Sequence, residues 1–135
     1  MSKHQFSQTI VDASVQELDK LAAAARGIRI AVLTTADGFQ VASTTSDDKD
    51  RIGKLAAISS SIYGMAAAIA KESGVEPCEI VSVEGLSGVI LVVEVPGIAN
   101  GMLLAVVASK TSMLGELRWM AATCGGHLAK LLSGQ

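Results

Sequence analysis

Two residues near the carboxyl end of the chain, Cys124 and His127, are of the types that form a nucleophile and its general base. They stand three positions apart, so a helix would place both on one face. Nucleophile–base pairs usually come from separate segments and need a third group that orients the base. We therefore interpret Cys124 as a core residue and His127 as a surface or boundary residue. The other histidine, His4, precedes the first expected element.

Other residues of catalytic type lack the pattern that catalysis needs. Glu79, Glu84 and Glu94 are spread over expected strands without the pairing of an acid–base couple. Ser59–Ser61 form a run that lacks the surrounding G-x-S-x-G of a nucleophile elbow. The chain also contains neither of the common glycine-rich phosphate loops. We expect a protein that is not an enzyme and that uses no cofactor, metal ion or small-molecule substrate.

The composition excludes further classes of function. With 135 residues, of which 50% are hydrophobic and 18% charged, the chain is long enough for a single domain, residues 1–135, with a sizeable core. Eleven Lys and Arg against 13 Asp and Glu give a net charge of −2. Nucleic-acid binding is not expected, because no basic excess faces a phosphate backbone and few aromatic rings are available to stack on bases.

The apolar segments do not resemble targeting or membrane segments. The first residues are polar and lack the apolar core of a signal peptide. The densest apolar runs, 89–93 and 102–108, are far shorter than the roughly 20 residues of a membrane-spanning helix. Cys78 and Cys124 are isolated, which argues against a disulfide framework or a zinc site. We expect a cytoplasmic protein with no membrane insertion and two buried thiols.

Apolar periodicity and turn signals predict eight elements in the order α-β-β-α-β-β-β-α. Helices are expected at about 8–25, at 50–73 and from about Ser112 onward, and strands at 28–35, 39–44, 78–84, 89–95 and 102–109.

Glycines and carboxylates mark where these elements turn, begin and end. Asp37-Gly38 predicts a two-residue hairpin with a type I′ turn. The acidic segment 46–50 supplies capping groups to the middle helix. Gly27 and Gly74 are expected to end the first and second helices.

The polarity of the strands predicts how the sheet is covered. Strands 28–35, 89–95 and 102–109 are apolar at almost every position, which predicts helices on both faces of the sheet. Strand 78–84 is more polar, as expected of an edge strand. An open edge favours pairing with a strand of another chain.

The middle helix is unusual because two of its sides lack charge. Between Ile52 and Ala70 only Lys54 is charged. One row is expected to pack on the sheet: Ile52, Leu55, Ala56, Ser59, Ile62, Ala66, Ile69 and Ala70. A second row contains only small residues: Gly53, Ala57, Ser60, Gly64 and Ala67.

Two apolar sides require two partners, and the sheet supplies one. Small residues allow close approach of another backbone, so the second partner is expected to be a helix, such as the same helix of a two-fold mate. The alternative is an alanine-rich helix whose polar face is simply weak.

The order and spacing of several segments resemble the roadblock (dynein light-chain) family. The segment 27–33 running into Asp37-Gly38 and 39–43 resembles the first hairpin of the family. The segment 101–108, followed by Leu114-Gly115, resembles its last strand and the start of its final helix. The likeness extends from about Thr9 to Leu132.

This resemblance implies an α+β fold in which a five-stranded antiparallel sheet has one long helix on one face and two helices on the other. It also implies a homodimer formed through the long helix and the third strand. The candidate interface residues are Gly53, Ala57, Ser60, Gly64, Ala67, Ile80, Val81 and Ser82.

For function, the resemblance implies a non-enzymatic regulator or effector scaffold of a small Ras-like GTPase, similar to bacterial regulators of gliding-polarity GTPases. The GTPase would face the paired long helices. Its candidate contacts are Arg51, Lys54, Ile58, Ser61 and Met65. The alternatives are a purely structural adaptor in a multiprotein or motor-type complex and a small-molecule sensor with a cavity under the long helix.

Overall fold

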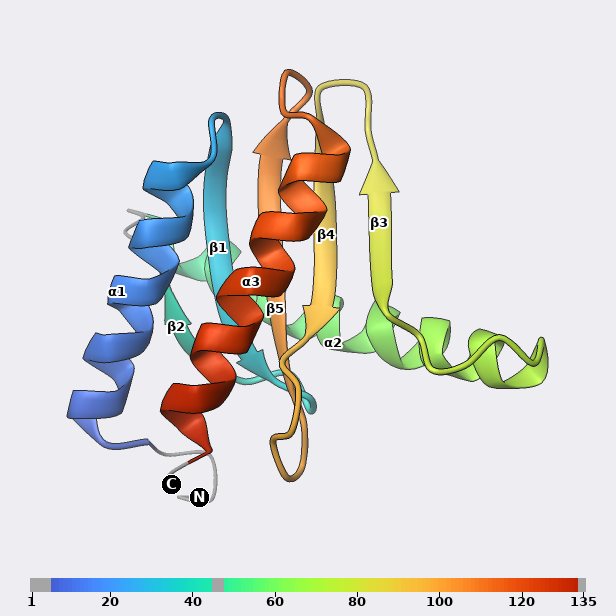
Figure 1. The fold of residues 1–135 in the computed structure, drawn as a ribbon, viewed down its shortest axis with the longest axis horizontal. Coiled ribbons are helices and arrows are strands. Elements are labelled where there is room, and N and C mark those ends of the chain that lie inside the picture. Colours follow the sequence, from blue (N-terminus) through green and yellow to red (C-terminus); the bar gives the residue numbers. More distant parts are fainter. Residues whose placement is uncertain (1–5, 45–47, 134–135) are drawn as a thin grey trace.

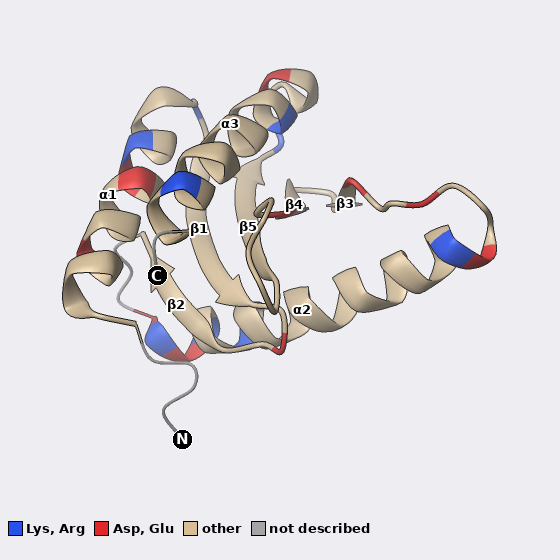
Figure 2. Ribbon diagram, turned by 60° about the horizontal axis from the view of Figure 1, so that its bottom comes forward, with Lys and Arg blue, Asp and Glu red and all other residues tan. Residues whose placement is uncertain are grey.

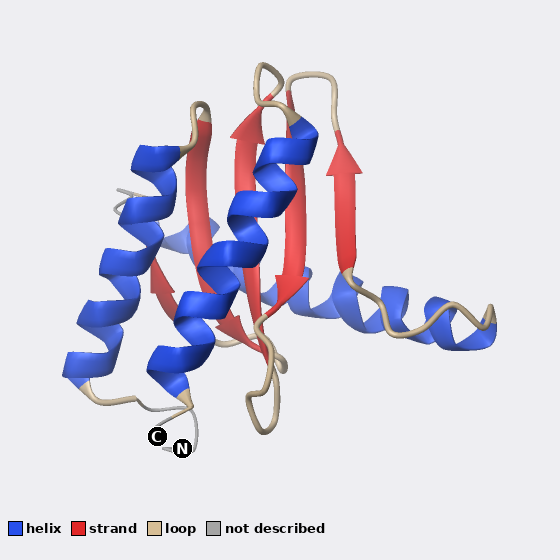
Figure 3. Ribbon diagram, viewed as in Figure 1, coloured by secondary structure: helices blue, strands red, loops and turns tan. Residues whose placement is uncertain are grey.

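The computed structural model describes residues 6–44 and 48–133, which contain three helices and five strands. In chain order the elements are α1 (Gln8–Ala24), β1 (Ile28–Thr35), β2 (Gln40–Ser43), α2 (Lys49–Glu72), β3 (Ile80–Glu84), β4 (Gly88–Glu94), β5 (Met102–Ser109) and α3 (Leu114–Leu132). The predicted order α-β-β-α-β-β-β-α is confirmed (Figure 3). His4, Ser46 and Asp47 lie outside the described residues.

The five strands form one antiparallel sheet in the order β2-β1-β5-β4-β3. The long, apolar strands β1, β4 and β5 occupy its centre. β3 lies at one edge, as its more polar sequence predicts, and only its first two residues are half-buried.

Helices cover both faces of the sheet, also as predicted. α1 and α3 run antiparallel to each other over one face, and α2 crosses the other face (Figures 1 and 3). Leu18 of α1 and Leu117 and Leu128 of α3 are buried in one cluster with Leu91 and Leu104 of the sheet.

The β1–β2 hairpin differs from the prediction. A type I′ turn needs positive φ at both central residues, but only Gly38, at φ +100°, has it, and Asp37 does not. The Gly38 amide donates to the Thr35 carbonyl at 3.0 Å, and the Thr35 amide donates to the Phe39 carbonyl at 2.9 Å. The connection is thus a three-residue loop with glycine in the left-handed position, and the register of the two strands shifts beside it.

The long helix α2 begins and ends at residues suited to those positions. The Asp48 side chain caps the start by accepting a hydrogen bond from the Arg51 amide at 3.0 Å. After the helix, Gly74 adopts φ +73° and the Val75 amide donates to the Ala70 carbonyl at 2.9 Å. The predicted end at Gly74 is confirmed.

The last helix begins two residues later than predicted. The Ser112 hydroxyl donates to the Arg26 carbonyl at 3.0 Å and so joins this loop to the segment before β1. α3 therefore starts at Leu114, with Met113 as its N-cap residue.

α2 is longer than the sheet is wide. Its first half lies across β2, β1 and β5, and its C-terminal half extends beyond the β3 edge (Figures 1 and 2). This overhang leaves part of an apolar helix with no strand beneath it.

Candidate interaction surface

Three large apolar side chains lie exposed along α2. Ile58, Met65 and Ile69 are 61%, 67% and 65% exposed. Their spacing of seven and four residues places them on one side of the helix. Charged residues lie at both ends of α2 and are absent from residues 55–70 (Figure 2). A helix in contact with water alone would normally carry charge on this side.

The residues that face the sheet differ in part from the prediction. Ile52, Ala56, Ser59 and Ala70 are buried as expected, and Leu55, Ile62 and Ala66 are half-buried. The placement of Ile69 on the sheet is wrong, because this part of the helix extends past the last strand. Tyr63, which the prediction left out, is buried.

The row of small residues is partly covered by the chain itself. A Cβ at Gly38 would lie 3.0 Å from the Ser60 hydroxyl and 3.4 Å from the Ala57 Cα, so the β1–β2 loop packs tightly on α2 here. A Cβ at Gly53 or Gly64 would meet nothing within 4 Å. Gly53 and Gly64 are therefore open to a partner molecule. Ala57 and Ser60, in the centre of the row, already pack against the β1–β2 loop of the same chain.

The hydroxyl groups on this surface have hydrogen-bond partners within α2. Ser60 and Ser61 both donate to the Ala57 carbonyl, at 3.0 and 3.2 Å. If a partner covered this side of α2, both hydroxyls would keep the Ala57 carbonyl as their acceptor. Burial of the surface therefore avoids the usual cost of an unpaired polar group.

The two cations at the start of α2 are paired with carboxylates one turn earlier. Arg51 Nε lies 3.3 Å from Asp48 Oδ2, and Lys54 Nζ lies 3.3 Å from Asp50 Oδ2. Both pairs are exposed, so each contributes little to stability and can open for another partner. Helical spacing brings Arg51 and Lys54 onto the same side as Ile58, Ser61 and Met65.

One side chain connects α2 to the edge strand. The Tyr63 hydroxyl donates to the Cys78 carbonyl, just before β3, at 2.6 Å. The Tyr63 ring packs with Val92 and Leu103 of the sheet. Burial raises the pKa of Tyr63 to about 12, and the nearby Cys78 and Glu94 add to this shift. The phenol is therefore a hydrogen-bond donor at ordinary pH.

The β3 edge lies beside the overhanging part of α2. Ile80, Val81 and Ser82 pair with Val93, Val92 and Leu91 of β4, respectively. Within the described chain, no strand pairs with the opposite side of β3. Its backbone groups on that side are available to another strand.

Cys124 and His127 do not form a pair, and both are directed to Glu17 of α1. The Cys124 thiol donates to the Glu17 carbonyl at 3.8 Å, and His127 Nδ1 lies 3.4 Å from Glu17 Oε1. Burial, with a smaller effect of the Glu17 charge, raises the pKa of Cys124 to about 11. The thiol is therefore protonated and a weak nucleophile near neutral pH. Cys78, expected to be buried, is half-buried, and both thiols are free.

Two hollows lie on the face opposite α2. A cleft of about 350 Å³ separates α3 from β3, and a groove of about 230 Å³ lies between α1 and α3. α2 lines neither of them. Among the described residues, α2 is also the one helix long and apolar enough to cross a membrane, and 22% of its qualifying segment is buried.

The fold and this surface define a class: a small α+β domain whose long helix covers one sheet face and remains largely exposed and apolar. Residues 14–108 match the family model of the Roadblock/LC7 domain. The chain belongs to the Roadblock/LC7 family.

Several solved structures share this fold. A Roadblock/LC7 domain from Streptomyces avermitilis matches with a TM-score of 0.81 and 21% identity over 88% of this chain and 97% of that one. The gliding protein MglB from Thermus thermophilus matches with a TM-score of 0.83 and 19% identity over 96% of both chains. Myxococcus xanthus MglB matches with a TM-score of 0.82 and 15% identity over 96% of this chain and 94% of that one. Curated protein sequences gave no match.

Proposed function

We propose that this protein is a non-enzymatic, cytoplasmic homodimer that regulates a small Ras-like GTPase or serves as its effector scaffold. The observation that carries the proposal is the overhang of α2, an apolar helix that extends past an open sheet edge. An apolar helix side and an unpaired strand that lie together form a surface suited to a second protein.

In the proposed dimer, β3 of each copy pairs with β3 of the other, and the two sheets become one. Ile80, Val81 and Ser82 supply the strand contacts. The α2 helices then meet across the two-fold axis, and each overhang lies over the sheet of the partner. The small residues Gly53, Ala57, Ser60, Gly64 and Ala67 allow this close approach, with the two open glycines available for direct contact.

The fixed relation of α2 to β3 supports a single combined interface. The Tyr63–Cys78 hydrogen bond holds the overhanging helix against the segment that leads into β3. Two copies related by a two-fold axis use the same surface on each side, so such an interface closes at a dimer.

The GTPase is proposed to bind across the paired helices. The proposed contacts are the cations Arg51 and Lys54 near the start of α2. Ile58, Ser61 and Met65 continue the contact surface along the same side of the helix. The family resemblance supports this class of partner, since similar bacterial chains regulate gliding-polarity GTPases. Neither cation is marked by a motif as an arginine finger, so the protein would act by reorganising the catalytic site of the GTPase itself.

The test is the mass of the purified protein by light scattering, alone and with a purified candidate Ras-like GTPase. We expect twice the mass of the chain, and an increase with the GTP-loaded but not the GDP-loaded GTPase. Single-turnover GTP hydrolysis then measures whether the bound GTPase is accelerated or slowed. A dimer that binds both nucleotide forms equally would identify a structural adaptor, and a monomer would contradict the proposed interface.

A further inference from the structure

The two helices on the α1/α3 face leave one side of the sheet uncovered. Five strands at about 4.8 Å spacing span roughly 19 Å, whereas packed helices lie about 8–10 Å apart, so two helices cover about four strands. α1 and α3 lie over the β2, β1, β5 and β4 side, and β3 emerges beyond α3 (Figure 1). On this face the sheet is therefore open over β3, beside α3.

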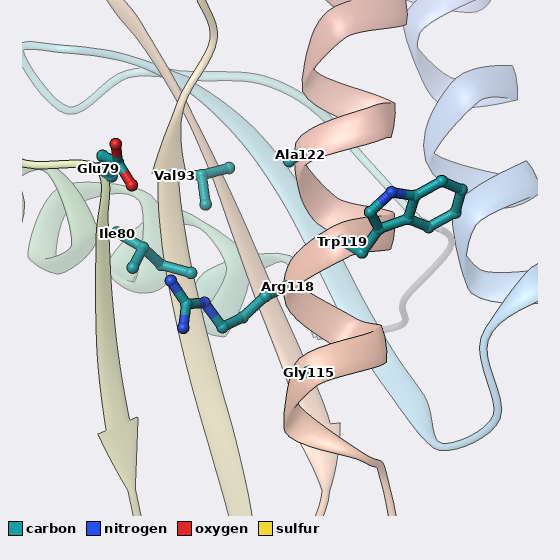
Figure 4. A pocket seen from close by; sticks show the side chains of 7 residues that line it. All are labelled: Glu79, Ile80, Val93, Gly115, Arg118, Trp119 and Ala122. Atoms are coloured by element: carbon teal, nitrogen blue, oxygen red, sulfur yellow. The ribbon is translucent and has the colours of Figure 1, made fainter.

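A cleft is present at this position. Its volume is about 350 Å³, and Ile80 of β3 and Val93 of β4 form its apolar floor (Figure 4). The α3 wall contains Gly115, Arg118 and Ala122, whose spacing of three and four residues places them on one side of the helix. The two small residues let another helix approach closely on either side of Arg118.

The charged groups of the cleft constrain what it can bind. The Arg118 side chain extends from α3 across the cleft toward Ile80, whereas Trp119 points to the other side of α3 (Figure 4). Arg118 makes no hydrogen bond or ion pair with the described residues, while the nearby cation Lys110 is engaged with Glu84 at 3.7 Å. Glu79, just before β3, is the acidic residue of the lining.

We propose that the cleft between α3 and β3 binds an amphipathic α-helix of a partner protein, with a carboxylate of that helix placed against Arg118. Apolar side chains of the bound helix cover Ile80 and Val93, and a basic residue of the helix suits Glu79. A helix of about 10–12 Å diameter placed beside α3 would cover β3 and extend past the edge of the sheet. This site lies on the face opposite the GTPase surface and shares Ile80 with the proposed dimer interface.

The test uses two synthetic 18-residue helical peptides with leucines at helical spacing on one side. They differ only at one position beside the leucines, which is glutamate in one peptide and lysine in the other. Isothermal titration calorimetry of each peptide with the full-length protein measures the binding. We expect the glutamate peptide to bind the full-length protein about tenfold more tightly than the lysine peptide, as for one well-placed interfacial charge pair.

Arg118→Glu is expected to reverse the preference between the peptides. Lys130→Glu, the same charge change near the exposed end of the same helix, is the matched control and should leave the preference unchanged. Circular dichroism checks that both variants fold. Failure of both peptides to bind at 1 mM, or a preference that Arg118→Glu does not alter, would overturn the proposal. If a monomeric variant still binds the peptide, the cleft is tested separately from the proposed dimer.

Discussion

The two faces of the sheet are completed in different ways. On one face, α1 and α3 enclose a continuous cluster that includes Leu18, Leu91, Leu104 and Leu128. On the other face, α2 alone covers two smaller clusters, one around Ile52 and one around Tyr63. A single helix that crosses several strands cannot enclose the face that two antiparallel helices enclose.

This difference accounts for the row of three large apolar side chains exposed along α2, whereas the exposed large apolar residues of α3 are Leu114 and Trp119. Over β2, β1, β5 and β4, the α1/α3 face is covered by helices of the chain itself. The α2 face has an apolar outer side at Ile58, Met65 and Ile69 that no element of the described chain covers. The outer side of α2 is therefore an apolar surface that the described chain leaves exposed.

The largest expected effect comes from placing the same substitution on each face. A Cβ at Gly64 of α2 or at Gly126 of α3 meets nothing within 4 Å, so arginine fits the isolated subunit at both positions. Gly64→Arg is expected to raise the dimer dissociation constant by roughly 100-fold or more, because it brings an unpaired charge into a close helix contact. Gly126→Arg should leave this constant unchanged.

Sedimentation equilibrium at several concentrations measures both variants, and thermal unfolding checks that each remains folded. If Gly64→Arg stays as dimeric as Gly126→Arg, the small residues of α2 do not form the interface. The exposed apolar side of α2 would then have to be explained by a different partner.

The second effect concerns one buried acid on each face, Tyr63 and Cys124. Their pKa values rise from 10.0 to about 12 and from 9.0 to about 11, chiefly through burial. Above about pH 9 the unfolded chain loses these protons while the folded protein keeps them. The free energy of unfolding should therefore fall as the pH rises from 9 toward 12.

Urea unfolding at several pH values in this range measures the slope. Tyr63→Phe is expected to remove the contribution of the α2 face, and Cys124→Ser that of the α1/α3 face. A slope that is unchanged in the double variant would show that other groups cause the loss of stability.

The smallest effect compares a buried and an exposed serine. The Ser14 hydroxyl on α1 is fully buried and has no hydrogen-bond partner among the described residues. Ser14→Ala is expected to stabilise the fold by about 1–2 kcal/mol, since it removes an unpaired buried group and improves helix propensity. Ser61→Ala on α2 gains the same propensity, about 0.5 kcal/mol, but loses the exposed hydrogen bond to the Ala57 carbonyl, so its stabilisation should be smaller. Urea midpoints of the two variants measure the difference, and equal midpoints would contradict it.

Most of the secondary structure was predictable because its signals are local. β1 and β5 have the predicted bounds, and the ends of α2 differ from the prediction by one residue. The polarity of β3 correctly indicated an edge strand. The loop at Asp37-Gly38 was predicted as a turn but of the wrong type, because the loop also packs on Ala57 and Ser60, which are distant in sequence.

The candidate surface was predictable only as a helix with too little charge. Helical periodicity placed Ile69 on the sheet and left out Tyr63, since a periodic pattern assumes that the sheet continues under the whole helix. The prediction that Cys124 lies in the core and His127 at the surface is confirmed, but the packing of α1 against α3 that brings both close to Glu17 could not be predicted.

The sequence by itself determined which segments are helices and strands, their order, and which strand is too polar for the centre of the sheet. These features depend on side chains within a few residues of one another. Only the tertiary structure decided that α2 crosses the sheet and extends past β3, leaving Ile58, Met65 and Ile69 exposed. That arrangement depends on how residues far apart in the chain pack at the same time, and no local pattern encodes it.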